Sequence, residues 1–192
     1  MINTLISMAE SGALPDFLIK KGIAHLCKER LRWAKKMASE ALEVHNQDWV
    51  KQLKNSPIAL VPEKANEQHY EVPPGFFEIV LGRNLKYSCG YWDKAVNNID
   101  ASEDRMLEIS SKRAELEDGQ DILELGCGWG SLTFYMAKKY PKSRIVAVSN
   151  SNDQRIFIEK KCEAESIANI KVLTCDMNDF DINKTFDRVV SI

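Results

Sequence analysis

The stretch from Asp121 to Leu132 reads DILELGCGWGSL. A short apolar run comes first, glycines then alternate with other residues, and a helical pattern follows. In a strand–loop–helix crossover, a ligand binds beyond the carboxyl end of the strand, because glycines let the backbone approach it and the first helical amides face it. The pattern therefore predicts a nucleotide-type ligand at this loop.

The spacing of the glycines excludes two common nucleotide-binding loops. Gly126, Gly128 and Gly130 form GxGxG, whereas the dinucleotide fingerprint GxGxxG would place its third glycine at Ser131. A P-loop would need Gly-Lys-Ser or Gly-Lys-Thr after the glycines, and neither follows. Turns also use glycine for structural reasons alone, so the flanking strand and helix carry the argument.

Short segments rich in Val, Ile and Leu alternate with helical segments after Gly119. The strand candidates are DILEL, RIVAVS, IKVLTC and FDRVVSI, and the helix candidates are SLTFYMAKKY and DQRIFIEKKCEAES. This alternation predicts an α/β fold with a Rossmann-like, doubly wound parallel sheet. Because FDRVVSI resembles an interior strand and the sequence ends in it at Ile192, we expect a sheet truncated after its fourth strand, in part of a longer protein. A naturally short chain is the alternative.

The first part of the chain is predicted to be helical. Residues 14–53 carry a helical pattern, with an apolar stripe at every fourth position: Ile19, Ile23, Cys27 and Leu31. Basic residues fall largely off this stripe: Lys20, Lys21, Lys28, Arg32, Lys35 and Lys36. They form either a solvated face or a face for peripheral contact with an anionic lipid surface.

Prolines end this helical pattern: Pro57, Pro62, Pro73 and Pro74. A short helix is predicted in PPGFFEIVLG, and a longer one from Ser102, as its N-cap, to Glu117. We therefore expect an N-terminal helical region with a ligand lid in residues 1–100, and the front part of the Rossmann-like domain in residues 101–192.

Composition narrows the classes of function. The net charge of −2 over 192 residues is not the basic charge that is typical of nucleic-acid-binding proteins. The 5 cysteines and 3 histidines form no CxxC pair and no zinc pattern, so we expect no metal and a reduced, cytoplasmic setting. No signal peptide and no membrane-spanning apolar run is predicted.

Polar residues follow the next two predicted strands. Asn150 and Gln154 come after RIVAVS, where an amide side chain can bind a diol as both donor and acceptor, although capping by Asn150 or Ser151 is the alternative. Asp176 and Met177 come after IKVLTC, where they could bind an adenine amino group and ring, although Asp176 could simply begin a turn. Candidate binding residues thus follow three successive strands, and together they make a single ligand site more convincing than any one of them does alone.

These segments resemble class I S-adenosylmethionine-dependent methyltransferases, in the group of cyclopropane fatty acid synthases and coclaurine-type N-methyltransferases. The resemblance rests on ELGCGWG, VSNSNDQ, CDMNDF and FDRVVSI, and on LKYSCGYWD at Leu85 to Asp93, which is similar to the YSCxYW signature of the group. The segment LPDFLIKKGIAHLCKERLRW looks more like the N-methyltransferase branch.

The resemblance implies a cofactor, S-adenosyl-L-methionine, and a role for each matching residue. The glycine loop would cradle the methionine half, and Glu124 would orient the loop by accepting its backbone amides. Asn150 and Gln154 would bind the ribose, and Asp176 and Met177 the adenine. A lid and a backbone segment near the sulfonium would complete the set: Tyr87, Ser88 and Ile192.

The resemblance also implies the reaction, which is N-methylation of a small amine or, alternatively, methylene transfer to an unsaturated phospholipid. The acid–base residues of the group would follow Ile192, so we expect no catalytic residue in this chain and no turnover by it alone; a non-catalytic truncated form is a further alternative. Cys89 matches a cysteine that holds a bicarbonate base in cyclopropane synthases, but a small buried thiol is the preferred interpretation. Trp92 and Trp129 are expected to pack rather than to stack on a substrate.

Overall fold

The computed structural model describes residues 2–40, 42–57 and 73–192, and it divides into two compact units, Met1–Ser56 and Pro57–Ile192. The first unit contains α1 (Ile2–Glu10), α2 (Asp16–Glu40) and α3 (Leu42–Lys54). The helical pattern of residues 14–53 is thus confirmed, although it forms two helices rather than one. Pro62 lies outside the described residues.

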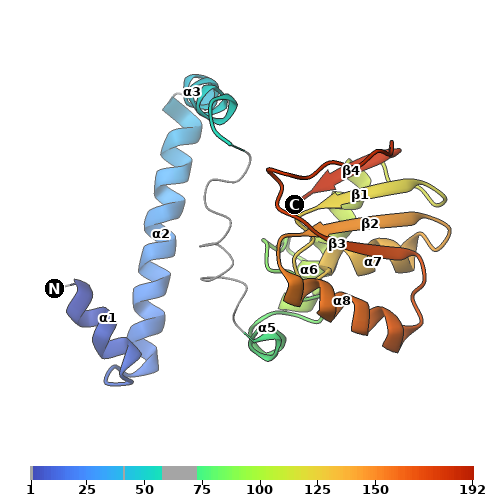
Figure 1. Cartoon of the computed structure of the whole chain (residues 1–192). Helices are drawn as coiled ribbons and strands as arrows, with labels where there is room; N and C mark the ends of the chain where they lie inside the picture. Colours follow the sequence, from blue (N-terminus) through green and yellow to red (C-terminus); the bar gives the residue numbers. More distant parts are fainter. Residues whose placement is uncertain (1, 41, 58–72) are drawn as a thin grey trace. The chain divides into compact units, whose positions relative to one another are not determined.

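The second unit is built on a parallel sheet (Figure 1). Its strands are β1 (Asp121–Leu125), β2 (Arg144–Ser149), β3 (Ile170–Thr174) and β4 (Arg188–Ser191), in the spatial order β3-β2-β1-β4. All pairings are parallel, with Leu123 aligned with Val146 on one side and with Val189 on the other. The predicted Rossmann-like sheet is confirmed, and its strand order changes direction between β1 and β4.

Helices α6 (Ile99–Arg113), α7 (Ser131–Lys139) and α8 (Asn152–Glu165) pack on one face of this sheet (Figure 1). Ile122 and Ile145 point to that face, where they meet Leu107 of α6 and Met136 of α7. The opposite face carries Leu123, Val146 and Val148, and side chains of the β3–β4 connection cover it: Cys175, Met177, Phe180, Ile182 and Phe186. The period of two along each strand therefore separates the two layers.

The start of α6 differs from the prediction. Asn98 is the N-cap, and its side chain accepts a hydrogen bond from the amide of Ala101 at 2.8 Å. Ser102 instead lies inside the first turn, 1% exposed, where its hydroxyl donates to the carbonyl of Ile99. The predicted N-cap was wrong because an earlier residue with an equally good acceptor lies at the true helix start. The short helix in PPGFFEIVLG is confirmed as α5 (Pro74–Val80).

Gly130 begins α7 in the left-handed conformation, with φ of 82°. A Cβ there would lie 2.8 Å from the ring of Phe134 and 3.0 Å from Ile158 of α8. Gly130 is therefore required for close packing of α7 against α8. Gly119 has a similar φ of 92° but open space around its Cα.

We predict that Gly130→Ala lowers the free energy of unfolding by about 2–4 kcal/mol, because it adds a clash to the left-handed strain. Gly119→Ala is the matched control and should lose only about 1 kcal/mol, since it has the strain alone. Urea unfolding followed by circular dichroism measures both. Equal losses in the two variants would contradict the packing role.

Candidate functional site

A cavity lies where the strand order changes direction, at the carboxyl ends of β1 and β4. Its wall comes from residues 85–88, the end of β1, the glycine loop, the start of α7, and Ile192. Its volume is about 100 Å³, which is smaller than the roughly 300–1,000 Å³ typical of complete small-molecule sites, so it can hold only part of a large ligand. Parallel α/β sheets bind ligands at such a position.

The cavity brings together predicted site residues from three distant parts of the sequence, and they are Tyr87, Ser88, Glu124, Gly126, Gly128 and Ile192. The other predicted site residues are not part of this wall, and they are Gly130, Asn150, Gln154, Asp176 and Met177. The structure therefore joins the residues predicted for the methionine half, with the exception of Gly130, whereas those predicted for the ribose and the adenine follow β2 and β3.

The glycine loop is held by backbone hydrogen bonds to the neighbouring strand. The amides of Gly126 and Cys127 both donate to the carbonyl of Val148 in β2, at 2.9 and 3.0 Å. Gly126 and Gly128 have positive φ angles of 75° and 55°, which glycine adopts without strain. The loop can therefore leave the strand in a tight turn and still line the cavity.

Glu124 is buried under this loop, and its partner differs from the expected one. The hydroxyl of Thr133 in α7 donates to its carboxyl group at 2.6 Å. The loop amides instead bond to Val148, so the expectation that Glu124 accepts them was wrong. Burial raises the pKa of Glu124 to about 7, while the bond from Thr133 opposes that shift.

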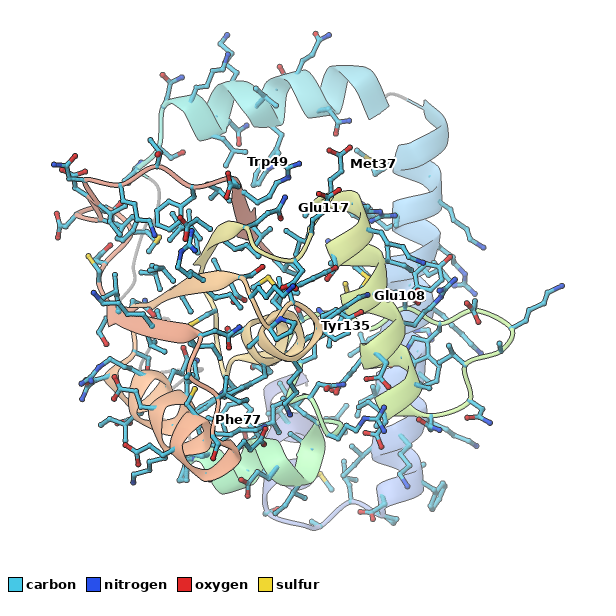
Figure 2. All side chains as sticks on the ribbon, turned by 90° about the vertical axis from the view of Figure 1, so that its right-hand side faces the viewer. Met37, Trp49, Phe77, Glu108, Glu117 and Tyr135 are labelled. Carbon is cyan, nitrogen blue, oxygen red and sulfur yellow. The ribbon has the colours of Figure 1, made fainter. Side chains whose placement is uncertain are left out.

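Aromatic packing supports the same wall. Phe77 on α5, which is labelled in Figure 2, is 1% exposed and lies with its ring centre 5.1 Å from that of Trp129 and 5.2 Å from that of Tyr87. Trp129 also meets Phe157 of α8 at 5.3 Å. The expected packing role is thus confirmed for Trp129. Trp92 is 58% exposed, so the expectation that it packs was wrong. Cys89, in contrast, is exposed, so its interpretation as a buried thiol was wrong.

Three donors in the cavity wall had no assigned role in ligand binding from the sequence: Lys86, Trp129 and Ser131. Lys86 is 4% exposed and its ammonium donates to the hydroxyl of Ser88. The indole N–H of Trp129 and the hydroxyl of Ser131 are buried without a partner among the described residues. Lys86 directly precedes Tyr87-Ser88 in LKYSC, and this adjacency was the one signal that could have identified it.

The side chains after β2 form a small buried network. The hydroxyl of Ser149 donates to Gln154 Oε1 at 2.6 Å and accepts from the amide of Ser151 at 3.0 Å. Ser151 is the N-cap of α8, as one alternative expected. Gln154 is 2% exposed, and its Nε2 has no partner in the described part of the chain. The capping of α8 by Ser151 therefore does not explain why Gln154 Nε2 is buried without a partner. Asn150, the other residue predicted to bind the ribose, is half-buried.

After β3, Asp176 accepts a hydrogen bond from the amide of Asn178 at 2.8 Å, as expected of a residue that begins a turn. Met177 packs against the sheet face formed by Leu123, Val146 and Val148. Within the residues that the structure describes, no cluster of His, Cys, Asp or Glu could hold a metal ion, and no helix is long and apolar enough to span a membrane.

The raised pKa of Glu124 predicts a pH-dependent stability. The folded state keeps this proton up to about pH 7, whereas an ordinary Glu loses it near 4.5, so the contribution is full below about 4.5 and is lost as pH rises through about 7. The loss should be about 3 kcal/mol. Chemical unfolding of Glu124→Gln, which keeps an acceptor for Thr133, should lack this decline; parallel curves for the variant and the parent would contradict the assignment.

Comparison with known proteins connects this site to a family. Residues 61–192 match the mycolic acid cyclopropane synthetase family. The chain is 37% identical over 192 residues to (S)-coclaurine N-methyltransferase from Thalictrum flavum subsp. glaucum, covering 100% of this chain and 53% of the relative. It is 32% identical over 126 residues to cyclopropane-fatty-acyl-phospholipid synthase from Escherichia coli, covering 66% of this chain and 31% of that protein.

Solved structures agree with these relatives. A crystal structure of coclaurine N-methyltransferase bound to N-methylheliamine and SAH superposes with a TM-score of 0.84 at 34% identity, covering 99% of this chain and 55% of that one. A mycolic acid cyclopropane synthase complexed with SAH and CTAB gives 0.60 at 26% identity, over 68% of this chain and 46% of that one. The chain spans about half the length of the relatives that it matches. The resemblance found in the sequence is confirmed, and the chain belongs to the mycolic acid cyclopropane synthetase family.

Proposed function

We propose that this chain binds S-adenosylmethionine in the cavity beside the glycine loop, as the cofactor-binding half of a methyltransferase. The observation that carries the proposal is that two residues of the cavity wall, Trp129 and Ser131, have buried donors, Nε1 and Oγ, without a partner in the described residues. Buried donors need acceptors, and a ligand with a carboxylate would supply them. The solved N-methyltransferase relative, which holds SAH (S-adenosylhomocysteine), supports this assignment.

The remaining predicted residues fit the extended shape of this ligand. We propose that the free Nε2 of Gln154, together with Asn150, binds the ribose hydroxyls beyond β2. Asp176 and Met177, beyond β3, would hold the adenine, since a carboxylate oxygen can accept from its amino group. Gly130 then contributes by starting α7 at the correct position rather than by contacting the cofactor.

The proposed reaction is methyl transfer to a small amine. Bound S-adenosylmethionine supplies an electrophilic methyl group, and the residues of this chain bind and orient it. An amine acceptor is favoured because the N-methyltransferase relative matches 100% of this chain, whereas the phospholipid synthase from Escherichia coli matches 66%. Methylene transfer to an unsaturated phospholipid is the second candidate, favoured by the family match.

We also propose a cellular compartment for the protein and a mode of contact with lipid. All 5 cysteines are unpaired in the structure, which fits a reduced, cytoplasmic compartment. A lipid surface, if it is contacted, would be met peripherally by the basic residues of α2, such as Lys28 and Arg32, which are exposed.

We predict that calorimetry detects binding of S-adenosylmethionine and S-adenosylhomocysteine and much weaker binding of NAD, since the loop lacks the dinucleotide spacing. Asp176→Ala should weaken binding of both ligands by about 1–3 kcal/mol through loss of a charged acceptor. Asp181→Ala, an exposed position on the same connection, is the control. Tighter binding of NAD would refute the proposed cofactor.

The acceptor class is tested by a transfer assay with a labelled methyl group, on a panel of amines and unsaturated phospholipids. The assay compares the 192-residue chain with a version extended after Ile192 by the matching half of the Thalictrum relative. We predict that the extended version labels amines and leaves phospholipids unlabelled. Label in the phospholipids alone would instead assign the second candidate function.

A further inference from the structure

Lys86 is a buried cation without a counter-ion. It is 4% exposed, it lines the cavity, and its ammonium donates to the hydroxyl of Ser88. No carboxylate among the described residues forms an ion pair with it. A buried charge without an opposite charge is costly, so the protein retains this ammonium at an energetic disadvantage unless a ligand completes the site.

The nearest candidate partner, Glu103, is already occupied. Its carboxylate accepts hydrogen bonds from the backbone amides of Gly82 and Asn84, each at 2.9 Å, and of Lys86 at 3.3 Å. Glu103 is 2% exposed on α6, so it fixes the backbone of residues 82–86 against that helix. Burial lowers the pKa of Lys86, and the charges of Cys89 and Glu103 only oppose this shift. Glu103 therefore positions Lys86 without neutralising it.

The surroundings of Lys86 indicate the shape of the missing anion. Trp129 and Ser131 belong to the same cavity wall, and the indole N–H of Trp129 and the hydroxyl of Ser131 are buried without a partner among the described residues. One ammonium, one indole N–H and one hydroxyl can together donate to the two oxygens of a single carboxylate. Glu124 belongs to the same wall, and its carboxyl group can accept a hydrogen bond from an amino group of the same ligand. These groups suit a zwitterion better than a phosphate.

We propose that Lys86 binds the carboxylate of the amino-acid arm of S-adenosylmethionine, with Trp129 and Ser131 as additional donors. This inference rests on the proposed function, which assigns the cofactor to this cavity. It adds a selectivity: Lys86 makes the site discriminate against cofactor analogues that lack the carboxylate.

The test compares S-adenosylmethionine with decarboxylated S-adenosylmethionine, which keeps the sulfonium and the amine but lacks the carboxylate. Calorimetry is carried out on the unmodified chain, on Lys86→Met, which keeps most of the side-chain volume, and on Lys94→Met, an exposed control on the same connection. The unmodified chain and Lys94→Met should prefer S-adenosylmethionine by about 10- to 100-fold, the range of a charge-assisted hydrogen bond. Lys86→Met should lose most of this preference.

The decarboxylated ligand also separates a binding role from a folding role. Lys86→Met should bind it as tightly as the unmodified chain does, since that ligand makes no contact with the ammonium; weaker binding of both ligands would mean that Lys86 is merely structural and would overturn the inference. An unchanged preference in Lys86→Met would overturn it too, while the proposed cofactor stands. Failure of the unmodified chain to bind either ligand or SAH would overturn the proposed function itself.

Discussion

The carbonyl of Val148 accepts hydrogen bonds from the amides of both Gly126 and Cys127, and the site depends on this pair of bonds. They tie the end of β1 to β2 at the point where the chain must leave the sheet. The loop turns there through glycines of positive φ and delivers Gly130 to the start of α7. Without this attachment, neither the cavity wall nor the packing of α7 against α8 would be defined.

Three buried ionisable groups lie in or beside the cavity wall, and each has a different set of hydrogen-bond partners. Glu103 is saturated by backbone amides, Glu124 has one hydroxyl donor and a raised pKa, and Lys86 has one hydroxyl acceptor and a lowered pKa. Buried charges rarely stabilise a fold relative to apolar residues of the same size. Their arrangement is therefore better explained by ligand recognition and by the position of residues 82–88 than by stability.

Helix α6 links residues 82–86 to the sheet. Its acidic side chains hold the backbone of residues 82–86, since Asp100 accepts from the amide of Arg83 and Asp104 from the side chain of Asn84. Its apolar side chain Leu107 is fully buried against α7 and the sheet. The same helix thus anchors residues 82–86 on one side and the core on the other, which explains how a segment with little regular structure can form part of the cavity wall.

The sequence by itself determined the strands, the helices between them, the GxGxG loop and the family, because hydrophobic periodicity and glycine spacing are local properties of the chain. It did not determine that Asn98 rather than Ser102 caps α6, since both are good caps within a few residues of each other. It also did not show that Gly130 has a packing role, because the neighbours that a Cβ there would meet, Phe134 and Ile158, are brought to it by the fold. Only the tertiary structure decided which donors are buried without partners, because the burial of Trp129 Nε1 and Ser131 Oγ arises from contacts between segments far apart in the sequence. The same holds for Lys86, which is buried with a hydroxyl rather than a carboxylate as its acceptor.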